Sequence, residues 1–460
     1  MALLSIREIE RLAPLLEPLE KQEPVLCAWR YHCSSEKMPF RTRIASRYRR
    51  IARTYIDRKR GIKRPKEGQV VIQLLRTSPS TSGNLIPVMK ELNSRGTPPF
   101  LIINRHTEGL LNLDLHSGHC SVNDILSCAE SSREKKEIND QAIEYAESMR
   151  NMAGSELFED AEDWISVGLA SSRFGGDLFR NASFILGDSD LAAFDKGFFL
   201  SCERAGIPSA IVQHGFFDMR QFPIHARYDF DWGPYFSRKA RSCGHPAERS
   251  VSTGCPRFDD LEKYGTFGDH DDLGKKYGSL KKPLVLAVSG VHAVHLYPSS
   301  INAFFNSLNA LIDNGISVLI RQHPVEKGTG IYRDKLGMDR FEKCVFMDPS
   351  EDLYSAMKIC DIVYLAISAA ALEAMLLGVP VLWEDVKEGN PFSDIPLLGG
   401  GMYVNEKEIA GTVQEIGREG KARKEFLARQ EEFLCSAISN RGRAAASIVD
   451  RIVSSKKGTY

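Results

Sequence analysis

Residues 317–326 read SVLIRQHPVE, and they place a short apolar run directly before a group of polar side chains. The run 317–320 is typical of a strand that is buried on both faces of a parallel sheet. Ligands of such sheets bind beyond the carboxyl ends of the strands, where Arg321, His323 and Glu326 follow. A permanent cation, an imidazole and a carboxylate suit a phosphate group and a nucleoside hydroxyl. The stretch therefore predicts an α/β domain with a phosphate site, and the alternative is a plain surface turn.

Strands and helices alternate on both sides of this stretch. In the second half the sequence predicts strands at 284–288, 317–320, 345–347, 361–365 and 380–383. In the first half it predicts strands at 70–75, 100–103, 183–187 and 209–212. An irregular stretch is expected from 213 to 278. Strands that alternate with helices, twice over, predict two doubly wound α/β domains.

The length supports two domains, because 460 residues exceed what one hydrophobic core usually organises. We predict a basic helical extension over 1–68 and an N-terminal Rossmann-like domain over 69–275. A C-terminal Rossmann-like domain is expected over 276–430. Residues 431–460 are expected to form a helix that packs back on the N-terminal domain. The two domains are expected to face each other across a ligand cleft.

Composition limits the class of protein. Hydrophobic residues make up 43% and charged residues 26% of the chain, which is typical of a soluble globular protein. No run approaches the roughly 20 apolar residues that span a bilayer, and residues 1–20 lack the apolar core of a secretory signal, so we expect a cytoplasmic protein. A formal net charge of zero argues against a nucleic-acid partner. The ten cysteines contain no Cys-x-x-Cys pair, so neither a zinc site nor a disulfide framework is predicted.

One segment departs strongly from this neutral balance. The stretch Arg41–Lys66 contains twelve Lys and Arg residues against Asp57 alone, with Ile and Tyr residues interleaved. A basic helix with an apolar stripe suits an anionic membrane surface or an acidic acceptor, which would place the protein at the inner face of the cell membrane. The alternative is a solvated helix that packs on its own domain.

Two more strand ends in the second half carry ligand-binding features. Ser289 and Gly290 follow the strand 284–288, where small residues let backbone N–H groups approach an anion. Ser368 is expected to cap the next helix, and the small Ala369 behind it lets a phosphate reach the helix dipole. Glu373 lies one turn into that helix, where it could accept hydrogen bonds from ribose hydroxyls. A common turn and a helix cap without a ligand are the alternatives.

The first half offers candidates for a catalytic base. A hydroxyl group that acts as a nucleophile needs a base to take its proton. His214 directly follows the strand 209–212, and its imidazole has a suitable pKa range. Asp188 and Asp190 follow the strand 183–187 and are the rivals. Metal binding by these two carboxylates is a minority interpretation.

These residues also carry a family resemblance. Residues 321–324 and the run 368–380 resemble the nucleotide-binding half of GT-B glycosyltransferases. They are most similar to bacterial surface-polysaccharide enzymes, namely capsule synthesis proteins, CDP-glycerol glycerophosphotransferases, and sialyl- and Kdo-transferases with a His-Pro motif. Residues 211–215 and 252–259 resemble the same group. Ala369 stands where the sialyltransferases have Ser or Thr, so the donor stays open.

The resemblance implies a GT-B fold with an N-terminal acceptor domain and a C-terminal nucleotide-donor domain. It makes His323 and Ser368 contacts to the donor phosphate, Glu373 a contact to the ribose, and His214 the base. The expected donor site comprises Ser289, Gly290, Arg321, His323, Pro324, Glu326, Ser368, Ala369 and Glu373.

The expected activity is that of a glycosyltransferase in capsule or lipopolysaccharide synthesis. It would move a sugar from CMP-nonulosonate, CMP-Kdo or another nucleotide sugar to a surface polysaccharide or a lipid-linked glycan. No metal or other cofactor is expected, since protein groups would balance the charge of the leaving phosphate. The alternatives are a CDP-glycerol-type polyol-phosphate transferase, a sugar-nucleotide 2-epimerase and a non-catalytic scaffold for envelope assembly.

Overall fold

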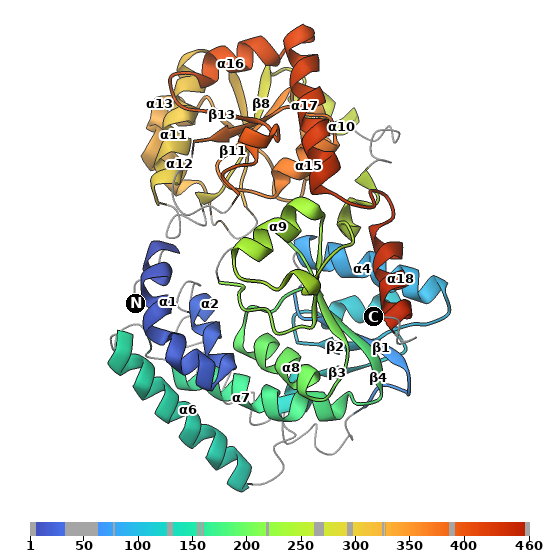
Figure 1. Ribbon diagram of the computed structural model, residues 1–460. Helices are drawn as coiled ribbons and strands as arrows, with labels where there is room; N and C mark the ends of the chain where they lie inside the picture. The colour runs from blue at the N-terminus through green and yellow to red at the C-terminus, as the bar shows by residue number, and fades with distance from the viewer. Residues whose placement is uncertain are drawn as a thin grey trace. The chain divides into compact units, whose positions relative to one another are not determined.

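The chain forms two compact units of α/β structure (Figure 1). Unit 1 comprises Met1–Arg257 with Ser439–Tyr460, and unit 2 comprises Phe258–Ile438. The computed structural model describes residues 6–32, 63–76, 79–126, 132–153, 158, 161–217, 220–261, 271–291, 298–323, 326, 328–385 and 392–455. Most of the basic segment, residues 41–62, lies outside the described residues.

The division between the units differs from the expected boundaries at residues 275 and 430. Helix α10 (Asp271–Tyr277) belongs to unit 2 because it packs against α14 (Leu353–Ile359). Helix α17 (Lys421–Ala437) also belongs there because it packs against α15 (Ala370–Leu376).

Unit 1 is built on seven parallel strands in the order β3-β2-β1-β4-β5-β6-β7. The strands are β1 (Gln69–Leu74), β2 (Phe100–Ile103), β3 (Gly118–Ser121), β4 (Ala182–Gly187), β5 (Ser209–Val212), β6 (Tyr228–Asp231) and β7 (Ser250–Ser252). The central strands are buried along almost their whole length, as expected when helices cover both faces of a sheet.

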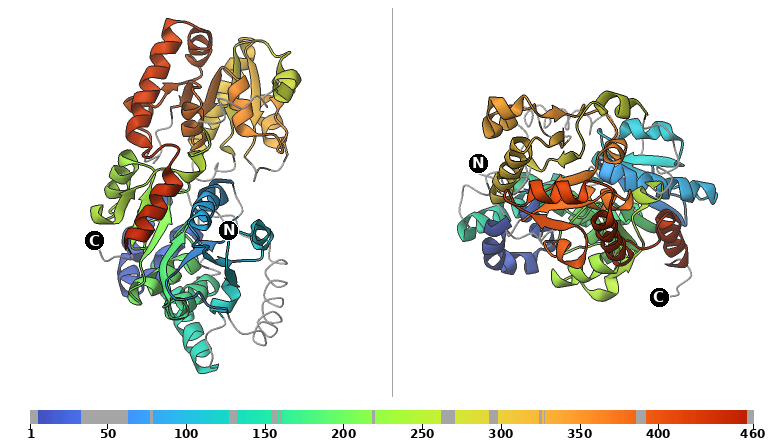
Figure 2. Two further views of the ribbon diagram at one scale, coloured as in Figure 1. Left: turned by 90° about the vertical axis from the view of Figure 1, so that its right-hand side faces the viewer. Right: turned by 90° about the horizontal axis from the view of Figure 1, so that it is seen from above.

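Helices cover the two faces of this sheet. Among the described residues, the helices of unit 1 are α1 (Ile6–Gln22), α2 (Trp29–His32), α4 (Pro79–Ser94), α5 (Val122–Leu126), α6 (Ser132–Ala153), α7 (Ala161–Leu178), α8 (Ala193–Arg204), α9 (Pro234–Ser242) and α18 (Ala444–Ser455), with short 3-10 turns such as η1 (Pro24–Ala28). Helices α4 and α18 share a core with β1, β4, β5 and β6, in which Leu85 and Ile448 are fully buried. Figure 2 shows α18, in red, beside the strands of unit 1.

Helix α8 lies close to α7 because small residues line the contact. A Cβ atom added at Gly197 of α8 would lie 2.2 Å from the carbonyl oxygen of Gly168 in α7. A larger side chain at Gly197 would therefore push the helices apart. This packing matters for function because α8 carries Asp195 and Lys196, which reach the carboxyl edge of the sheet.

The described N-terminal helices are part of unit 1. Helix α1 packs against α6, and η1 packs against α7 and α8. Trp29 is fully buried, and its ring contacts that of Phe158 edge to face. Within the described part of the chain, no helix has both the length and the apolar character that crossing a membrane requires.

Unit 2 has six parallel strands in the order β10-β9-β8-β11-β12-β13. The strands are β8 (Leu284–Val288), β9 (Ser317–Arg321), β10 (Val345–Phe346), β11 (Ile362–Leu365), β12 (Val381–Glu384) and β13 (Met402–Val404). Besides α10, α14, α15 and α17, the helices are α11 (Pro298–Asp313), α12 (Gly330–Leu336), α13 (Met338–Phe341) and α16 (Ile409–Ile416).

Both sheets reverse their strand order at one point. The reversal lies between β1 and β4 in unit 1 and between β8 and β11 in unit 2. The crevice beyond the carboxyl ends of the strands at such a point is the usual ligand site of a doubly wound sheet. The expected α/β class is therefore confirmed, and the topology indicates where each unit binds its ligand.

The expectation that residues 213–278 form an irregular stretch is wrong. It contains β6, α9 and β7, which complete one side of the unit 1 sheet. The strand β6 reads YDFD, and its two aspartates hide the apolar signal of a buried strand. The C-terminal residues also form two helices, α17 and α18, where one was expected.

Candidate functional site

An ion pair spans the switch point of unit 1. Arg76 follows β1, Asp188 follows β4, and Arg76 Nη1 lies 3.2 Å from Asp188 Oδ1. The second arm, Nη2, lies 3.0 Å from Asp195 Oδ2 in α8. Gln73 Nε2 donates to the other oxygen of Asp195 at 3.0 Å. The side chains of Asp188 and Asp195 are 1% and 2% exposed against 26% for Arg76, so the carboxylates fix a guanidinium that still reaches solvent.

His214, directly after β5, has a defined tautomer. Its Nδ1 lies 2.9 Å from the carbonyl oxygen of Asp188. Because a carbonyl oxygen only accepts, Nδ1 carries the hydrogen and Nε2 carries the lone pair. The pKa of His214 is lowered to about 4, with burial as the largest cause and the charges of Arg76 and Arg257 acting in the same direction. The imidazole is therefore neutral at pH 7, with Nε2 able to accept a proton.

The backbone around His214 is held on several sides. The carbonyl oxygen of Gln213 accepts from Trp232 Nε1 at 2.7 Å and from Asn84 Nδ2 at 3.1 Å. Arg257 Nη1 donates to the carbonyl oxygen of His214 at 3.2 Å. Arg257 belongs to the stretch 252–259 that resembles surface-polysaccharide enzymes, so the fold brings this stretch to the candidate base.

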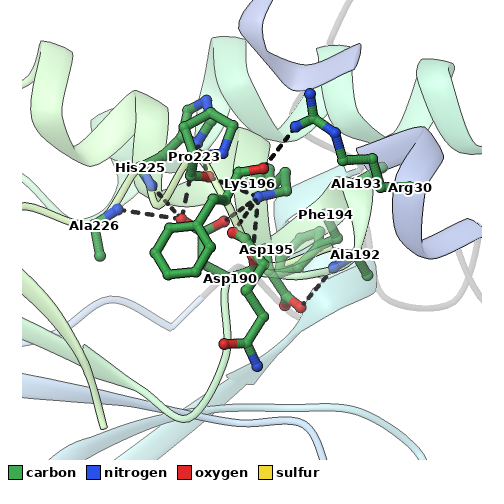
Figure 3. A network of polar contacts seen from close by, with 12 residues as sticks. Arg30, Asp190, Ala192, Ala193, Phe194, Asp195, Lys196, Pro223, His225 and Ala226 are labelled. Atoms are coloured by element: carbon green, nitrogen blue, oxygen red, sulfur yellow. Dashed lines mark hydrogen bonds and ion pairs between the residues drawn. The ribbon is translucent and has the colours of Figure 1, made fainter. Parts of the chain in front are cut away.

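Both rivals of His214 have structural partners. Asp188 pairs with Arg76, as described above. The side chain of Asp190 is fully buried, 3.7 Å from the ammonium nitrogen of Lys196, and it accepts from the backbone N–H groups of His225 and Ala226 (Figure 3). Of the three candidates, only His214 is partly exposed. This arrangement favours His214 as the base.

A small pocket lies beside His214 at the ends of β4, β5 and β6. Its lining includes Ser189, Phe217, Gln221 and Asp229 together with His214 itself. Burial raises the pKa of Asp229 well above its ordinary value, and the neighbouring Asp231 raises it further. The lining of this pocket therefore includes a carboxyl group whose charged form is disfavoured by burial.

The three predicted strand-end groups of unit 2 meet at its switch point. A Cβ atom added at Gly290 would lie 3.6 Å from the carbonyl oxygen of Ile367, the residue before Ser368. The Ser289 N–H donates to the carbonyl oxygen of Arg321 at 2.9 Å. The Ser289 hydroxyl donates to Glu326 Oε1 at 2.8 Å. The loops after β8, β9 and β11 thus lie together at one sheet edge.

The charged side chains of Arg321 and Glu326 form hydrogen bonds to other groups of the protein. Arg321 donates to the carbonyl oxygens of Asp348 at 2.9 Å and Pro349 at 3.3 Å, which fixes the loop after β10. Glu326 accepts from Ser289 and, at 2.9 Å, from the hydroxyl of Tyr332. His323 is partly exposed. Pro324 lies outside the described residues.

The helix after β11 begins at Ala370, as expected. The residue in its N-cap position is Ala369, which has helical backbone angles, and not the expected Ser368. The Ser368 hydroxyl accepts from the N–H of Ala370 at 3.2 Å, so it still supports the first turn. Glu373 is 7% exposed and accepts from the hydroxyl of Tyr354 at 3.3 Å.

Several site residues were missed from the sequence. Arg76 follows a predicted strand, so the rule that led to His214 could have found it. Asp195 lies inside a helix, and its partners Gln73 and Arg76 are 122 and 119 positions away, so no local signal marks it. Lys196 lies in the same helix and bonds to backbone carbonyls, which no sequence pattern marks. Among the described residues, no cluster of three or more His, Cys, Asp or Glu side chains is arranged to hold a metal ion.

Searches by sequence gave no match, either to a family model or to a curated protein. Solved structures do match. A glycosyltransferase from Rickettsia africae ESF-5 is similar over 86% of this chain and 100% of its own, with 13% identity and a TM-score of 0.56. The UDP-GlcNAc 2-epimerase from Neisseria meningitidis, bound to UDP-GlcNAc, covers 84% of this chain and 100% of its own, with 16% identity and a TM-score of 0.52.

A variant of the wall teichoic acid polymerase TagF is also similar, over 85% of this chain and 90% of its own, with 13% identity and a TM-score of 0.50. Together with the two topologies above, these likenesses establish the fold. The chain has the GT-B fold, which consists of two Rossmann-like domains. At these identities the likeness concerns the fold, and the activity has to be argued from the sites.

Proposed function

We propose that the chain is a glycosyltransferase that moves a sugar from a nucleotide-activated donor to a surface polysaccharide or a lipid-linked glycan. The observation that carries the proposal is His214, a neutral imidazole whose tautomer is set by the Asp188 carbonyl. It lies near Arg76, the fixed cation at the switch point of a Rossmann-like domain. Such a group is suited to take the proton of an acceptor hydroxyl.

In the proposed reaction, the acceptor hydroxyl gives its proton to Nε2 of His214 while its oxygen bonds to the anomeric carbon of the donor. The bond from that carbon to the phosphate oxygen breaks, and its electron pair stays on the phosphate. We assign donor binding to the switch point of unit 2. There Ser289, Gly290 and Ser368 would approach the phosphates, with His323 as a further phosphate contact and Glu373 near the ribose.

We further propose that the transfer needs no metal ion. The imidazole of His323 and the backbone N–H groups at Gly290 would stabilise the charge of the leaving phosphate. If this is right, turnover persists in EDTA at the rate seen with added Mg²⁺. A rate that collapses in EDTA and returns with a divalent cation would contradict it.

Nucleotide binding is the most direct test of the proposal. Thermal unfolding would be followed with CMP, CDP, UDP and GDP. A ligand that binds the native state raises the midpoint, by an amount set by its concentration relative to Kd. We expect one of the four to stabilise the protein clearly. Stabilisation by none of them would overturn the assignment of a nucleotide-activated donor.

A 2-epimerase is the second candidate, because a UDP-GlcNAc 2-epimerase has a TM-score close to that of the glycosyltransferase neighbour. The two activities differ in their need for an acceptor. An epimerase exchanges the hydrogen at C2 of UDP-GlcNAc with deuterium from D₂O when no acceptor is present, and NMR would detect it. The proposed transferase leaves that position unlabelled.

The finer features of acceptor and location belong to the proposal as well. A lipid-linked acceptor fits the basic segment Arg41–Lys66, which suits an anionic membrane surface. Likeness to TagF supports a polyol-phosphate donor as an alternative. If the chain were a non-catalytic scaffold, an enzyme-dead His214 variant would still support envelope assembly in cells.

A further inference from the structure

The segment 220–226 lies next to the candidate base. Gln221 lines the pocket beside His214, as does Phe217. The rings of Phe217 and Phe222 meet edge to face, with centroids 5.4 Å apart. Both phenylalanines are almost fully buried, at 3% and 6% exposure. The segment therefore contributes to the wall of the pocket beside the His214 ring.

Lys196 of α8 holds the segment from one side. Its ammonium group is fully buried and donates to the carbonyl oxygens of Pro223 at 2.8 Å and Gln221 at 3.2 Å, and to that of Asp190 at 3.0 Å (Figure 3). The Asp190 carboxylate accepts from the N–H groups of His225 and Ala226, so it binds the same segment.

Arg30 holds the segment from the N-terminal helices. Its Nη1 donates to the carbonyl oxygen of Phe222 at 2.6 Å. Its Nη2 lies 2.7 Å from Glu20 Oε2, and the other oxygen of Glu20 accepts from Trp29 Nε1 at 2.7 Å. Arg30 is 9% exposed, and both side chains of the Arg30–Glu20 pair are 11% exposed. The planar guanidinium thus joins α1 to the segment beside His214, a geometry that a lysine cannot reproduce.

We propose that Arg30 is a positioning residue for His214: by holding the Phe222 carbonyl, it keeps Phe222 against Phe217 and excludes water from the pocket beside the imidazole. The inference rests on the proposed role of His214 as the base. The N-terminal helices, which lie far from His214 in the sequence, would then contribute to the unit 1 site through Arg30.

The test compares two variants of the full-length protein. Arg30→Met removes the bond to Phe222 as well as the ion pair. Glu20→Gln removes the charge of the ion pair but leaves Arg30 able to donate to Phe222. The readout is an NMR titration of the His214 ring, with its signal assigned through His214→Asn. Arg76, Arg257 and the Asp188 carbonyl, the other groups that influence the pKa of His214, are unchanged in both variants.

Burial is the largest cause of the low pKa of His214, so water admitted to the pocket raises it. We expect Arg30→Met to raise this pKa by about one unit or more towards the ordinary value near 6.5, and Glu20→Gln to leave it near that of the wild type. In Arg30→Met, kcat should fall while the affinity for the nucleotide stays the same. Circular dichroism and the unfolding midpoint would show that both variants are folded.

An unchanged pKa of His214 in Arg30→Met, or an equal rise in both variants, would overturn the positioning role. If Arg30→Met does not fold, Arg30→Lys takes its place, because it keeps the charge but loses the two-armed geometry. A smaller rise in the pKa of His214 is then expected. The titration needs no substrate. If the protein has no transferase activity, the proposed function is wrong, but the titration still tests whether Arg30 positions the residues around His214.

Discussion

The two switch points have the same topology, but different kinds of side chain surround them. In unit 1 the crevice is bordered by ion pairs whose carboxylates are buried, Arg76 with Asp188 and Asp195 and Lys196 with Asp190, beside the partly exposed imidazole of His214. In unit 2 the loops at the crevice present Ser289, Gly290 and Ser368. The charged groups there are bound to the protein, Arg321 to two carbonyls and Glu326 to two hydroxyls.

Under the proposed function, this difference matches two separate tasks. Buried ion pairs hold side chains in fixed positions, which suits a reactive group that has to meet its substrate in one orientation. Small residues and hydroxyls at a strand end let the backbone approach a large anion. The proposed function places proton transfer in unit 1 and nucleotide binding in unit 2, and the comparison is consistent with it. Each prediction below changes one side of it.

The largest expected effect on stability concerns Lys196. Replacing it by methionine in Lys196→Met leaves Asp190 buried without its cation and frees three carbonyl oxygens from their donor. Breaking a buried pair in this way costs about 3–5 kcal/mol. Chemical denaturation would measure the loss. As a control, Arg340→Met removes the exposed Arg340–Asp313 pair and should change little. Equal effects of the two substitutions would contradict the role given to Lys196.

A smaller effect is expected from His323 in unit 2. If this imidazole contacts the donor phosphate, His323→Ala removes a hydrogen bond to a charged group, worth about 1.5–3 kcal/mol. The nucleotide should then bind about 10- to 100-fold more weakly, as isothermal titration calorimetry would show. The pKa of His214 should not move. An unchanged Kd would remove His323 from the donor site.

The smallest expected effect is that of pH on kcat/KM. A base must be deprotonated, and burial lowers the pKa of His214 to about 4. The value of kcat/KM should therefore stay level from about pH 8 down to about pH 5 and fall only near pH 4, approaching a tenfold drop per pH unit below it. A limb near pH 6.5 would mean that the base has the pKa of an ordinary solvated histidine and not the lowered pKa of His214.

Much of the fold could be predicted from the sequence. The strands 209–212 and 284–288 occupy the predicted residues, because each is a short apolar run that turn residues delimit. The strands β3, β6, β7 and β13 were missed. The first three read GHCS, YDFD and SVS, and polar side chains in each obscure the pattern that marks a buried strand. The fourth reads MYV and is only three residues long. Their strand conformation depends on pairing with neighbours in the sheet.

The candidate site could be predicted only in part. The position of His214 followed from the rule that ligands bind beyond strand ends. Which ring nitrogen of His214 carries the hydrogen could not be predicted, because it bonds to the backbone carbonyl of Asp188, in the loop after another strand. The roles of Asp188 and Asp190 depend on Arg76 and Lys196, and Arg76 is separated from Asp188 by 112 positions. Pairings over such distances come from the topology, which a single sequence does not display.

The central claim is that His214 performs the chemistry and unit 2 binds the nucleotide. His214→Ala tests it most directly, with turnover and nucleotide affinity measured on the same preparation. Loss of a general base lowers kcat by about 10²- to 10⁴-fold, and we expect the nucleotide Kd to stay within about twofold of the wild type. Turnover close to that of the wild type, or equal losses in turnover and nucleotide affinity, would contradict this division of roles.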